Sequence, residues 1–366
     1  MMRLHRHLFV GAVCLLSAAA FAEDLTPLDA LLAPGETHLI AAAPPGAEGA
    51  LLFHYRLWLP EDYATSVTRL YPVMFIAGPI GNVEMGEMAD RLMRERWIVA
   101  MLVESRNGSN AWQANFVAAH DDVLRRVRAD ETMRFCTGLS GAAKVCSVYP
   151  GLRPGFRGVV LQAAGPWGPR VYEEEANAGA AVYGTFGAFD FNLSHARRIR
   201  RGLPPSVRHM VEIWDGQHAW APPAVFGRAL DWVLAAVLND APVSPDAYRW
   251  YVENRLSDLA RTEHAGQRLY LAWNLSRVVA AAAAALDEPL RRQMDKALAE
   301  VPDAAEQVAL REYFDLFERD AASRGRELLA IADDYAEHAR RHPGTYGAEL
   351  AEIRRRSLYW EMRRDP

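Results

Sequence analysis

The sequence predicts an α/β protein with a mostly parallel, doubly wound sheet, followed by an all-helical C-terminal region. Two observations predict this class. From Leu51 to about Asp240, short apolar runs of strand length alternate with segments of helical spacing, and such alternation builds a parallel sheet covered by helices on both faces. After Asp240 the strand-like runs cease and helical patterns continue. We therefore predict one domain over residues 23–240 and a helical region over residues 241–366.

The apolar runs are expected to be strands because they are short, apolar and bounded by turn residues. In chain order these runs are 51–59, 71–76, 97–103, 133–137, 156–162, 181–186 and 207–214. Helical patterns lie between or after them at 83–96, 115–129, 141–149, 191–202 and 222–238. The link at 163–180 contains Gly, Pro and an acidic run, and it is too short for a large lid.

The C-terminal region starts with a Pro-containing linker at 241–246 and is predicted to be helical, with breaks at Pro302, Gly325 and Pro343-Gly344. The segment 342–345, followed by 346–352, resembles the turn of tetratricopeptide-like arrays. No period of about 34 residues is sustained, however. A tetratricopeptide-like array and a plain helical bundle therefore both stay open, and the region is a candidate surface for a protein partner.

The N-terminus has the features of an export signal. Basic residues and histidines precede an apolar run at 8–20, and Ala20-Phe21-Ala22 has the small-x-small form of a cleavage site. We expect residues 1–22 to be a signal peptide and the mature chain to be exported, either periplasmic or secreted. The apolar run is shorter than the ~20 residues that span a bilayer, so no stable membrane span is expected.

Composition and cysteine content narrow the class further. The 366 residues are 51% hydrophobic and 24% charged, which is typical of a globular protein, and the net charge of -5 provides no basic field for nucleic acid. After signal cleavage only Cys136 and Cys146 remain. They can pair in an oxidising compartment, but we expect two buried thiols. The sequence has no zinc-type cluster and no cofactor motif, so neither a metal nor a cofactor is expected.

The segment 133–149 carries the most informative motif. Gly138-Leu139-Ser140-Gly141-Ala142 stands between an apolar run and a helical pattern. A strand, a tight turn that lifts a serine and a following helix form a nucleophile elbow. Gly138 and Gly141, the first and fourth residues of this pentapeptide, have no Cβ and therefore permit the close backbone contacts of such a turn. The usual last glycine is Ala142 here, so helix packing is expected to persist. The pentapeptide alone is equally typical of a loop.

Two later residues complete the order serine, acid, histidine that this architecture uses for nucleophilic catalysis. Asp190 follows the predicted strand 181–186, and His218 follows the strand 207–214 in a turn that contains glycine. The carboxyl ends of parallel strands meet at one edge of a sheet, so we expect these residues to lie near Ser140. His218 would take the Ser140 proton and Asp190 would orient His218. The alternatives are a helix N-cap for Asp190 and a backbone-satisfied loop histidine for His218.

The oxyanion formed by attack of Ser140 needs two N–H donors. We expect one from Gly141 and one from the loop 77–82, where Pro79 has no N–H and either Gly78 or Ile80 must donate.

Three tryptophans lie on predicted loops or element ends at the same edge of the sheet. We predict that Trp167 and Trp220 bind substrate, with core packing as the alternative for both. Trp112 is the weaker candidate.

Several segments resemble the alpha/beta-hydrolase superfamily. Residues 59–63, Leu-Pro-Glu-Asp-Tyr, resemble the Leu-Pro-x-x-Tyr entry of esterase-D, feruloyl esterase and polyhydroxyalkanoate depolymerase-like members. Residues 137–145 and 215–220 resemble the Gly-x-Ser-Gly-Gly-Ala-Arg and Gly-x-His-x-Trp segments of exported relatives, and 104–108 also fits them. Ala142 replaces a Gly of that pattern and Lys144 replaces an Arg. The resemblance covers roughly residues 51–236.

This resemblance implies a serine hydrolase that cleaves a small-molecule or polymer ester through an acyl-enzyme intermediate. It implies a reaction type and leaves the acyl and alcohol groups open. A peptidase of the same fold is an alternative, because an activated serine also attacks amides. A third hypothesis, from another class, is a non-catalytic binding protein that engages a partner through its helical tail.

Overall fold

The computed structural model describes residues 32–45, 51–81, 83–177, 179–282, 285–299, 304–323 and 327–363. The predicted signal peptide at 1–22 lies outside these residues. Among the described helices, none combines the length and the apolar character needed to cross a membrane.

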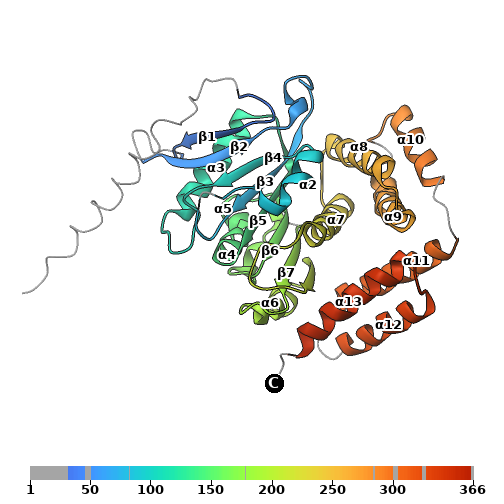
Figure 1. Cartoon of the computed structure of the whole chain (residues 1–366). Helices are drawn as coiled ribbons and strands as arrows, with labels where there is room; N and C mark the ends of the chain where they lie inside the picture. Colours follow the sequence, from blue (N-terminus) through green and yellow to red (C-terminus); the bar gives the residue numbers. More distant parts are fainter. Residues whose placement is uncertain are drawn as a thin grey trace, which may run out of the picture.

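A single sheet of eight strands occupies the centre of the described structure (Figure 1). The strands are β1 (Thr37–Ala42), β2 (Phe53–Trp58), β3 (Tyr71–Ala77), β4 (Ile98–Leu102), β5 (Ala129–Leu139), β6 (Phe156–Gln162), β7 (Ala181–Gly187) and β8 (Arg208–Trp214). Their order across the sheet is β1-β2-β4-β3-β5-β6-β7-β8. β2 pairs antiparallel with β1 and β4, and the other pairs are parallel. The predicted mostly parallel sheet is confirmed, with β1 as an additional edge strand.

Twelve α-helices lie in the described residues. They are α2 (Ala89–Arg94), α3 (Trp112–Arg126), α4 (Gly141–Cys146), α5 (Tyr149–Leu152), α6 (Ala196–Gly202), α7 (Pro223–Asp240), α8 (Pro245–Arg261), α9 (Ala265–Ala282), α10 (Glu288–Ala299), α11 (Ala304–Ala322), α12 (Glu327–Arg341) and α13 (Tyr346–Arg363). The predicted all-helical region after residue 240 is confirmed.

The alternation of side chains along the central strands explains why both faces of the sheet are covered, since successive residues point to opposite faces. Phe75 of β3 packs on Phe116 of α3, with ring centroids 5.8 Å apart, in the core that also includes α4 and α6. Its neighbour Met74 belongs to the opposite core, with Phe226 of α7 and residues of α2. The sheet thus separates two apolar layers.

Three predicted helices are shorter than expected, among them the pattern at 141–149, where α4 already ends at Cys146. The pattern at 83–96 becomes a 3₁₀ turn and then α2, because Gly86 has a left-handed φ of 52° that a continuous helix does not accommodate. The pattern at 191–202 becomes helix α6 only from residue 196. The Asp190 carboxylate accepts a hydrogen bond from the Asn192 N–H at 2.7 Å, and this local turn replaces the first helical residues.

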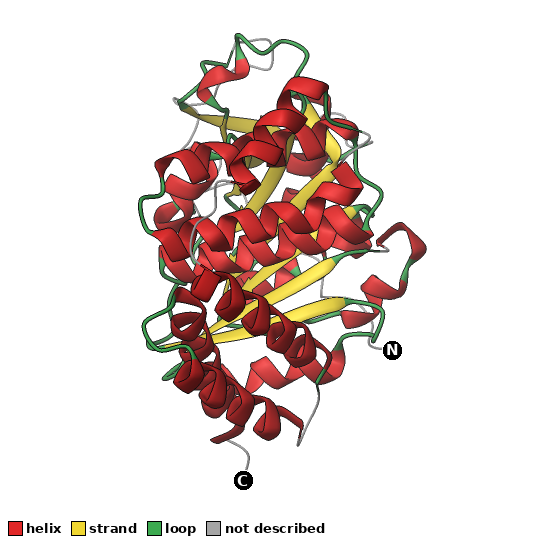
Figure 2. Cartoon of the chain, turned by 90° about the vertical axis from the view of Figure 1, so that its right-hand side faces the viewer, coloured by secondary structure: helices red, strands yellow, loops and turns green. Residues whose placement is uncertain are grey.

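Helices cover the second face of the sheet (Figure 2). After residue 240, α8 packs on β3 and β5, α11 and α13 pack on β8, and α9, α10 and α12 pack on other helices. The Ser357 hydroxyl of α13 accepts a hydrogen bond from the Ile213 N–H at 2.8 Å, and the Arg354 guanidinium donates to the Val211 carbonyl. An edge strand exposes unpaired backbone groups. Helix α13 therefore covers the edge of β8 that no described strand occupies.

Buried ion pairs also join this region to the sheet domain. Asp320 of α11 is fully buried and contacts Arg354 of α13 and Arg200 of α6, the latter at 3.1 Å. Burial alone would raise the pKa of Asp320, but the two guanidinium groups lower it below its usual value. One apolar core likewise extends from Met74 of β3 to Leu358 of α13. The predicted domain boundary after residue 240 stays a prediction, and so does the tetratricopeptide-like alternative.

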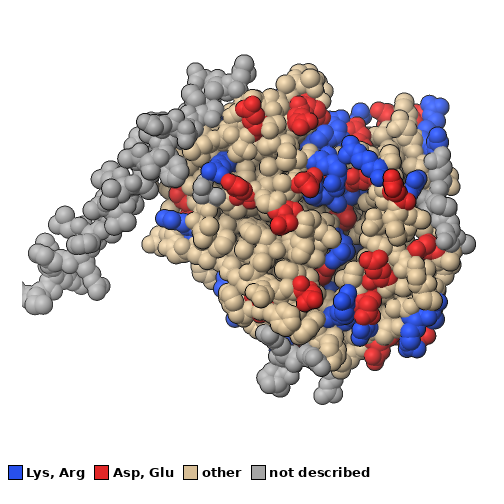
Figure 3. All heavy atoms as spheres, viewed as in Figure 1, with Lys and Arg blue, Asp and Glu red and all other residues tan. Residues whose placement is uncertain are grey.

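Acidic and basic side chains lie interspersed on the face drawn in Figure 3, where blue and red atoms gather close to one another. This face shows no broad field of one sign.

Candidate active site

Ser140 occupies a strained turn between β5 and α4. Its φ of 59° and ψ of -123° are unusual for a residue with a side chain. The Ser140 N–H donates to the Gln162 carbonyl at the end of β6 at 2.8 Å, which holds the turn against the sheet. A Cβ on Gly138 would lie 2.8 Å from the backbone of Ala142, so glycine permits α4 to pack directly on β5. The predicted strand, tight turn and helix are all present.

The two cysteines on either side of this turn are free, buried thiols. Cys136 donates to the Cys146 carbonyl at 3.4 Å, and Cys146 donates to the Thr137 carbonyl at 3.1 Å. Burial raises the pKa of Cys136 and keeps it protonated. The expectation of two unpaired buried thiols is confirmed.

Asp190 and His218 meet beyond the carboxyl ends of β7 and β8. Asp190 Oδ1 lies 2.8 Å from His218 Nδ1, with Asp190 fully buried and the His218 side chain 20% exposed. The two loops touch through their backbones, because the Phe189 N–H donates to the Gly216 carbonyl at 2.9 Å. A Cβ on Gly187 would stand 2.2 Å from the Gln217 carbonyl oxygen, so this close approach needs glycine.

The structure connects Ser140 to this pair through Phe191. The Phe191 ring lies on the His218 imidazole, with centroids 4.0 Å apart, and it also lines a cavity together with Ser140. No hydrogen bond between Ser140 and His218 is found in the described residues. Asp190 and His218 are therefore paired, while Ser140 lies beside them at the same edge of the sheet; their catalytic roles stay predictions.

The cavity at Ser140 is open to solvent and has a volume of about 690 Å³. Its wall combines the elbow with the loop after β4, the start of α3, the loop after β6 and the start of the α6 segment. The lining residues are Arg106, Asn107, Gly108, Ser109, Asn110, Trp112, Ser140, Gly141, Lys144, Val145, Pro166, Trp167, Phe191, Asn192 and Arg198.

The predicted oxyanion donors are placed unequally. Gly141 lines the cavity, whereas Gly78 is buried against Val83 and Ile80 is 86% exposed, and neither is part of the cavity wall as described. Asn107 stands between them and Gly141. Its N–H donates to the Pro79 carbonyl at 2.9 Å, and a Cβ on Gly141 would lie 1.9 Å from its Oδ1.

Sequence reasoning gave no role to the loop that carries Asn107. The only available signal was the resemblance of residues 104–108 to relatives, which identified the segment without a function.

The tryptophans also separate. Trp167 lines the cavity and is 62% exposed, and its ring centroid lies 6.3 Å from that of Trp112, which lines the same wall. Trp220 is partly buried against the apolar core beneath α7, and the cavity wall as described does not include it. Phe191 also belongs to this cavity wall. The sequence did not indicate this, because Phe191 begins a segment with the apolar spacing of an amphipathic helix.

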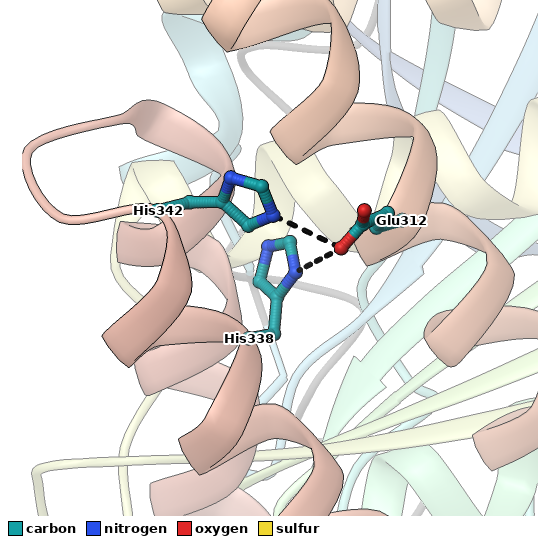
Figure 4. Close-up of side chains that lie close together, drawn as sticks. All are labelled: Glu312, His338 and His342. Atoms are coloured by element: carbon teal, nitrogen blue, oxygen red, sulfur yellow. Dashed lines mark hydrogen bonds and ion pairs between the residues drawn. The ribbon is translucent and has the colours of Figure 1, made fainter.

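Glu312, His338 and His342 form a separate group with metal-ligand side chains, on α11 and at the end of α12 (Figure 4). Glu312 Oε2 lies 2.9 Å from His342 Nε2 and 3.7 Å from His338 Nδ1. Arg341 pairs with the same carboxylate oxygen at 2.8 Å. A divalent ion would have to displace this guanidinium. The His338-x-x-x-His342 spacing is the only part of this group that is visible in the sequence.

No protein-family model and no curated protein matches this chain. Among solved structures, the chain is similar to a ferulic acid esterase at 16% identity, with a TM-score of 0.43, over 55% of this chain and 98% of the other. It is similar to an S-formylglutathione hydrolase from Staphylococcus aureus at 16% identity, with a TM-score of 0.39, over 56% and 99%. It is also similar to an IroE-like serine hydrolase from Shewanella oneidensis at 12% identity, with a TM-score of 0.43, over 70% and 99%.

The strand order and the turn at Ser140 define the class without these likenesses. A sheet in the order β1-β2-β4-β3-β5-β6-β7-β8, with β2 antiparallel and a strained serine between β5 and the next helix, is an alpha/beta-hydrolase fold. The chain adds to this fold the helical region that covers β8. The fold predicted from sequence is confirmed.

Proposed function

We propose that this protein is an exported serine hydrolase that cleaves a carboxylic ester through an acyl-enzyme intermediate. The observation that carries the proposal is the buried Asp190–His218 hydrogen bond at the same sheet edge as the strained Ser140 turn, with one cavity in front of the serine. The proposed acid, base and nucleophile each follow a parallel strand of the sheet, which is the arrangement of the alpha/beta-hydrolase architecture.

In the proposed mechanism, His218 removes the Ser140 proton as the hydroxyl oxygen attacks the ester carbonyl. Asp190 accepts the hydrogen bond from His218 Nδ1, which fixes the tautomer and stabilises the imidazolium. The imidazolium then protonates the departing alcohol, and water repeats the sequence on the acyl-enzyme. The Ser140–His218 hydrogen bond must form in the substrate complex, where catalytic contacts tighten.

The Gly141 N–H is the proposed first oxyanion donor. Gly78 and Ile80 remain the backbone candidates for the second, and the side-chain amide of Asn107 is a further candidate because it lies against Gly141 within the cavity. Asn107→Ala should lower kcat by about 10²–10³ if this amide is the donor.

A fluorophosphonate probe tests the proposal, because labelling requires an activated serine whatever the substrate. We expect the wild-type protein to be labelled and to hydrolyse para-nitrophenyl acetate, and Ser140→Ala to do neither while keeping its circular dichroism spectrum. An unlabelled, folded wild-type protein would contradict the proposal and favour the non-catalytic binding protein. Faster cleavage of a peptide para-nitroanilide than of the matching ester would favour the peptidase.

Export is proposed from the N-terminal sequence alone, and N-terminal sequencing of protein recovered outside the cytoplasm should begin near Glu23. A protein partner for the helical region also remains a proposal. The packing of α13 on β8 supports a first role for that region within this chain.

A further inference from the structure

All charged side chains that line the cavity at Ser140 in the described residues are positive. Arg106, Lys144 and Arg198 line it, and its wall within the described residues contains no Asp or Glu. The three cations come from different elements, namely the loop after β4, helix α4 and helix α6. Positive charge therefore surrounds the serine from several sides.

These three cations also lack partners within the described structure, where none of them makes an ion pair or a side-chain hydrogen bond. Arginines elsewhere in the described chain are commonly paired, as Arg153 is with Asp121 at 2.6 Å. Unpaired like charges around one cavity repel each other and offer no stability in return. Such a cost is typical of functional sites, where a ligand supplies the missing charge.

The cations are positioned to act on a molecule bound at Ser140. Lys144 lies one helical turn after the serine, and its N–H donates to the Ser140 carbonyl at 3.3 Å, so both residues lie on the same side of α4. Arg106 is adjacent to Asn107, whose side chain contacts Gly141. Arg198 and Lys144 also act on His195, whose pKa is lowered mainly by burial and further by these two cations.

The cavity wall also contains three aromatic side chains. Trp112, Trp167 and Phe191 line the same cavity, with Trp167 62% exposed and Phe191 73% exposed. Large exposed rings next to cations suit a ligand that combines a flat apolar part with an anionic group.

We propose that the substrate of this site is a carboxylate-bearing ester with an aromatic or other apolar part. Arg106, Lys144 and Arg198 attract and orient the carboxylate, and the aromatic wall binds the apolar part. This inference rests on the proposed serine hydrolase function and adds the substrate class to it.

A matched pair of esters tests this inference. Para-acetoxybenzoate and para-acetoxybenzamide share the acetyl group and the ring and differ in the charge of one substituent. We expect kcat/KM for the wild-type protein to be at least about tenfold higher for the benzoate at low salt, because a one-signed cleft concentrates an oppositely charged substrate. The ratio should fall towards one at high ionic strength. A second pair, para-nitrophenyl hexanoate and the para-nitrophenyl monoester of adipic acid, places the charge on the acyl side.

Charge-removing variants assign the effect to residues. Arg106→Gln, Lys144→Gln and Arg198→Gln should each lower the anion-to-neutral ratio of kcat/KM by about threefold or more. Arg292→Gln is the matched control, because Arg292 lies on α10 with its side chain 72% exposed and should leave the ratio unchanged.

The outcomes separate this inference from the function on which it rests. Labelling of Ser140 and hydrolysis of the neutral esters, without preference for the anion in either pair, would overturn the substrate class alone. Absence of both labelling and hydrolysis would overturn the serine hydrolase proposal and this inference with it. A preference that all three variants retain would overturn the assignment to these cations.

Discussion

Replacing Asp190 with Asn isolates the charge of the proposed triad acid, because Asn keeps the shape of the side chain and can still accept the Asn192 N–H. Asp190 is fully buried and its Oδ1 lies 2.8 Å from His218 Nδ1. Unit charges at that separation attract by about 6 kcal/mol at an effective dielectric constant of about 20. This attraction develops only when His218 becomes an imidazolium in the transition state, so its loss raises the barrier directly.

At about 1.4 kcal/mol for each factor of ten, Asp190→Asn should lower kcat for para-nitrophenyl acetate by about 10⁴. Thermal unfolding should show that the variant is folded. Asp215→Asn is the matched control, since Asp215 lies on the His218 loop and is exposed, and its kcat should stay within about twofold of wild type. A folded Asp190→Asn protein within tenfold of wild type, or an equal loss in the Asp215 variant, would refute the assignment.

Three further predictions concern stability and the oxyanion site. Arg354→Met removes one cation from buried Asp320 and should lower the free energy of unfolding, measured by urea titration, by about 3–5 kcal/mol. The control Arg356→Ala breaks an exposed ion pair with Glu352 of 4.0 Å and should lower it by less than about 1 kcal/mol. Because the pKa of Asp320 is lowered in the folded protein, the ionised carboxylate stabilises the fold fully above its unfolded pKa of about 3.9. This stabilisation is lost as the pH falls through the folded pKa. The free energy of unfolding should therefore fall more steeply with decreasing pH for wild type than for Asp320→Asn. Gly141→Ala places a methyl group where the Asn107 side chain lies, so kcat should fall by about 10²–10³ with little change in melting temperature. An unchanged kcat would show that this contact is not part of the oxyanion site.

Local patterns in the sequence determined the sheet and the turn at Ser140. Strand-length apolar runs at 156–162 and 71–76 became β6 and β3 with nearly the same ends, because buried parallel strands need continuous apolar segments. Gly138 marked the turn, since its lack of a Cβ is what lets α4 approach β5. These features depend on neighbours in the chain, and a single sequence shows them.

Other features depended on loops that the sequence does not connect. The cavity wall brings the loop after β4 beside α4 and the start of the α6 segment, so Asn107 and Phe191 acquire their place only in the folded chain. Trp220 looked equivalent to Trp167 as a loop aromatic, yet it packs on the core beneath α7. Which of two apolar rings meets solvent is decided by the element packed against it, and the sequence does not state that partner.

The packing of the helical region on the sheet is the clearest feature that only the tertiary structure determined. Composition marked a change at residue 240, and the helices after it are present as predicted. It did not indicate that Arg354 and Ser357, more than a hundred residues after β8, would satisfy the backbone of that strand. Helical periodicity determines which residues share a face, but the surface on which that face packs depends on exposed edges and buried charges elsewhere in the fold.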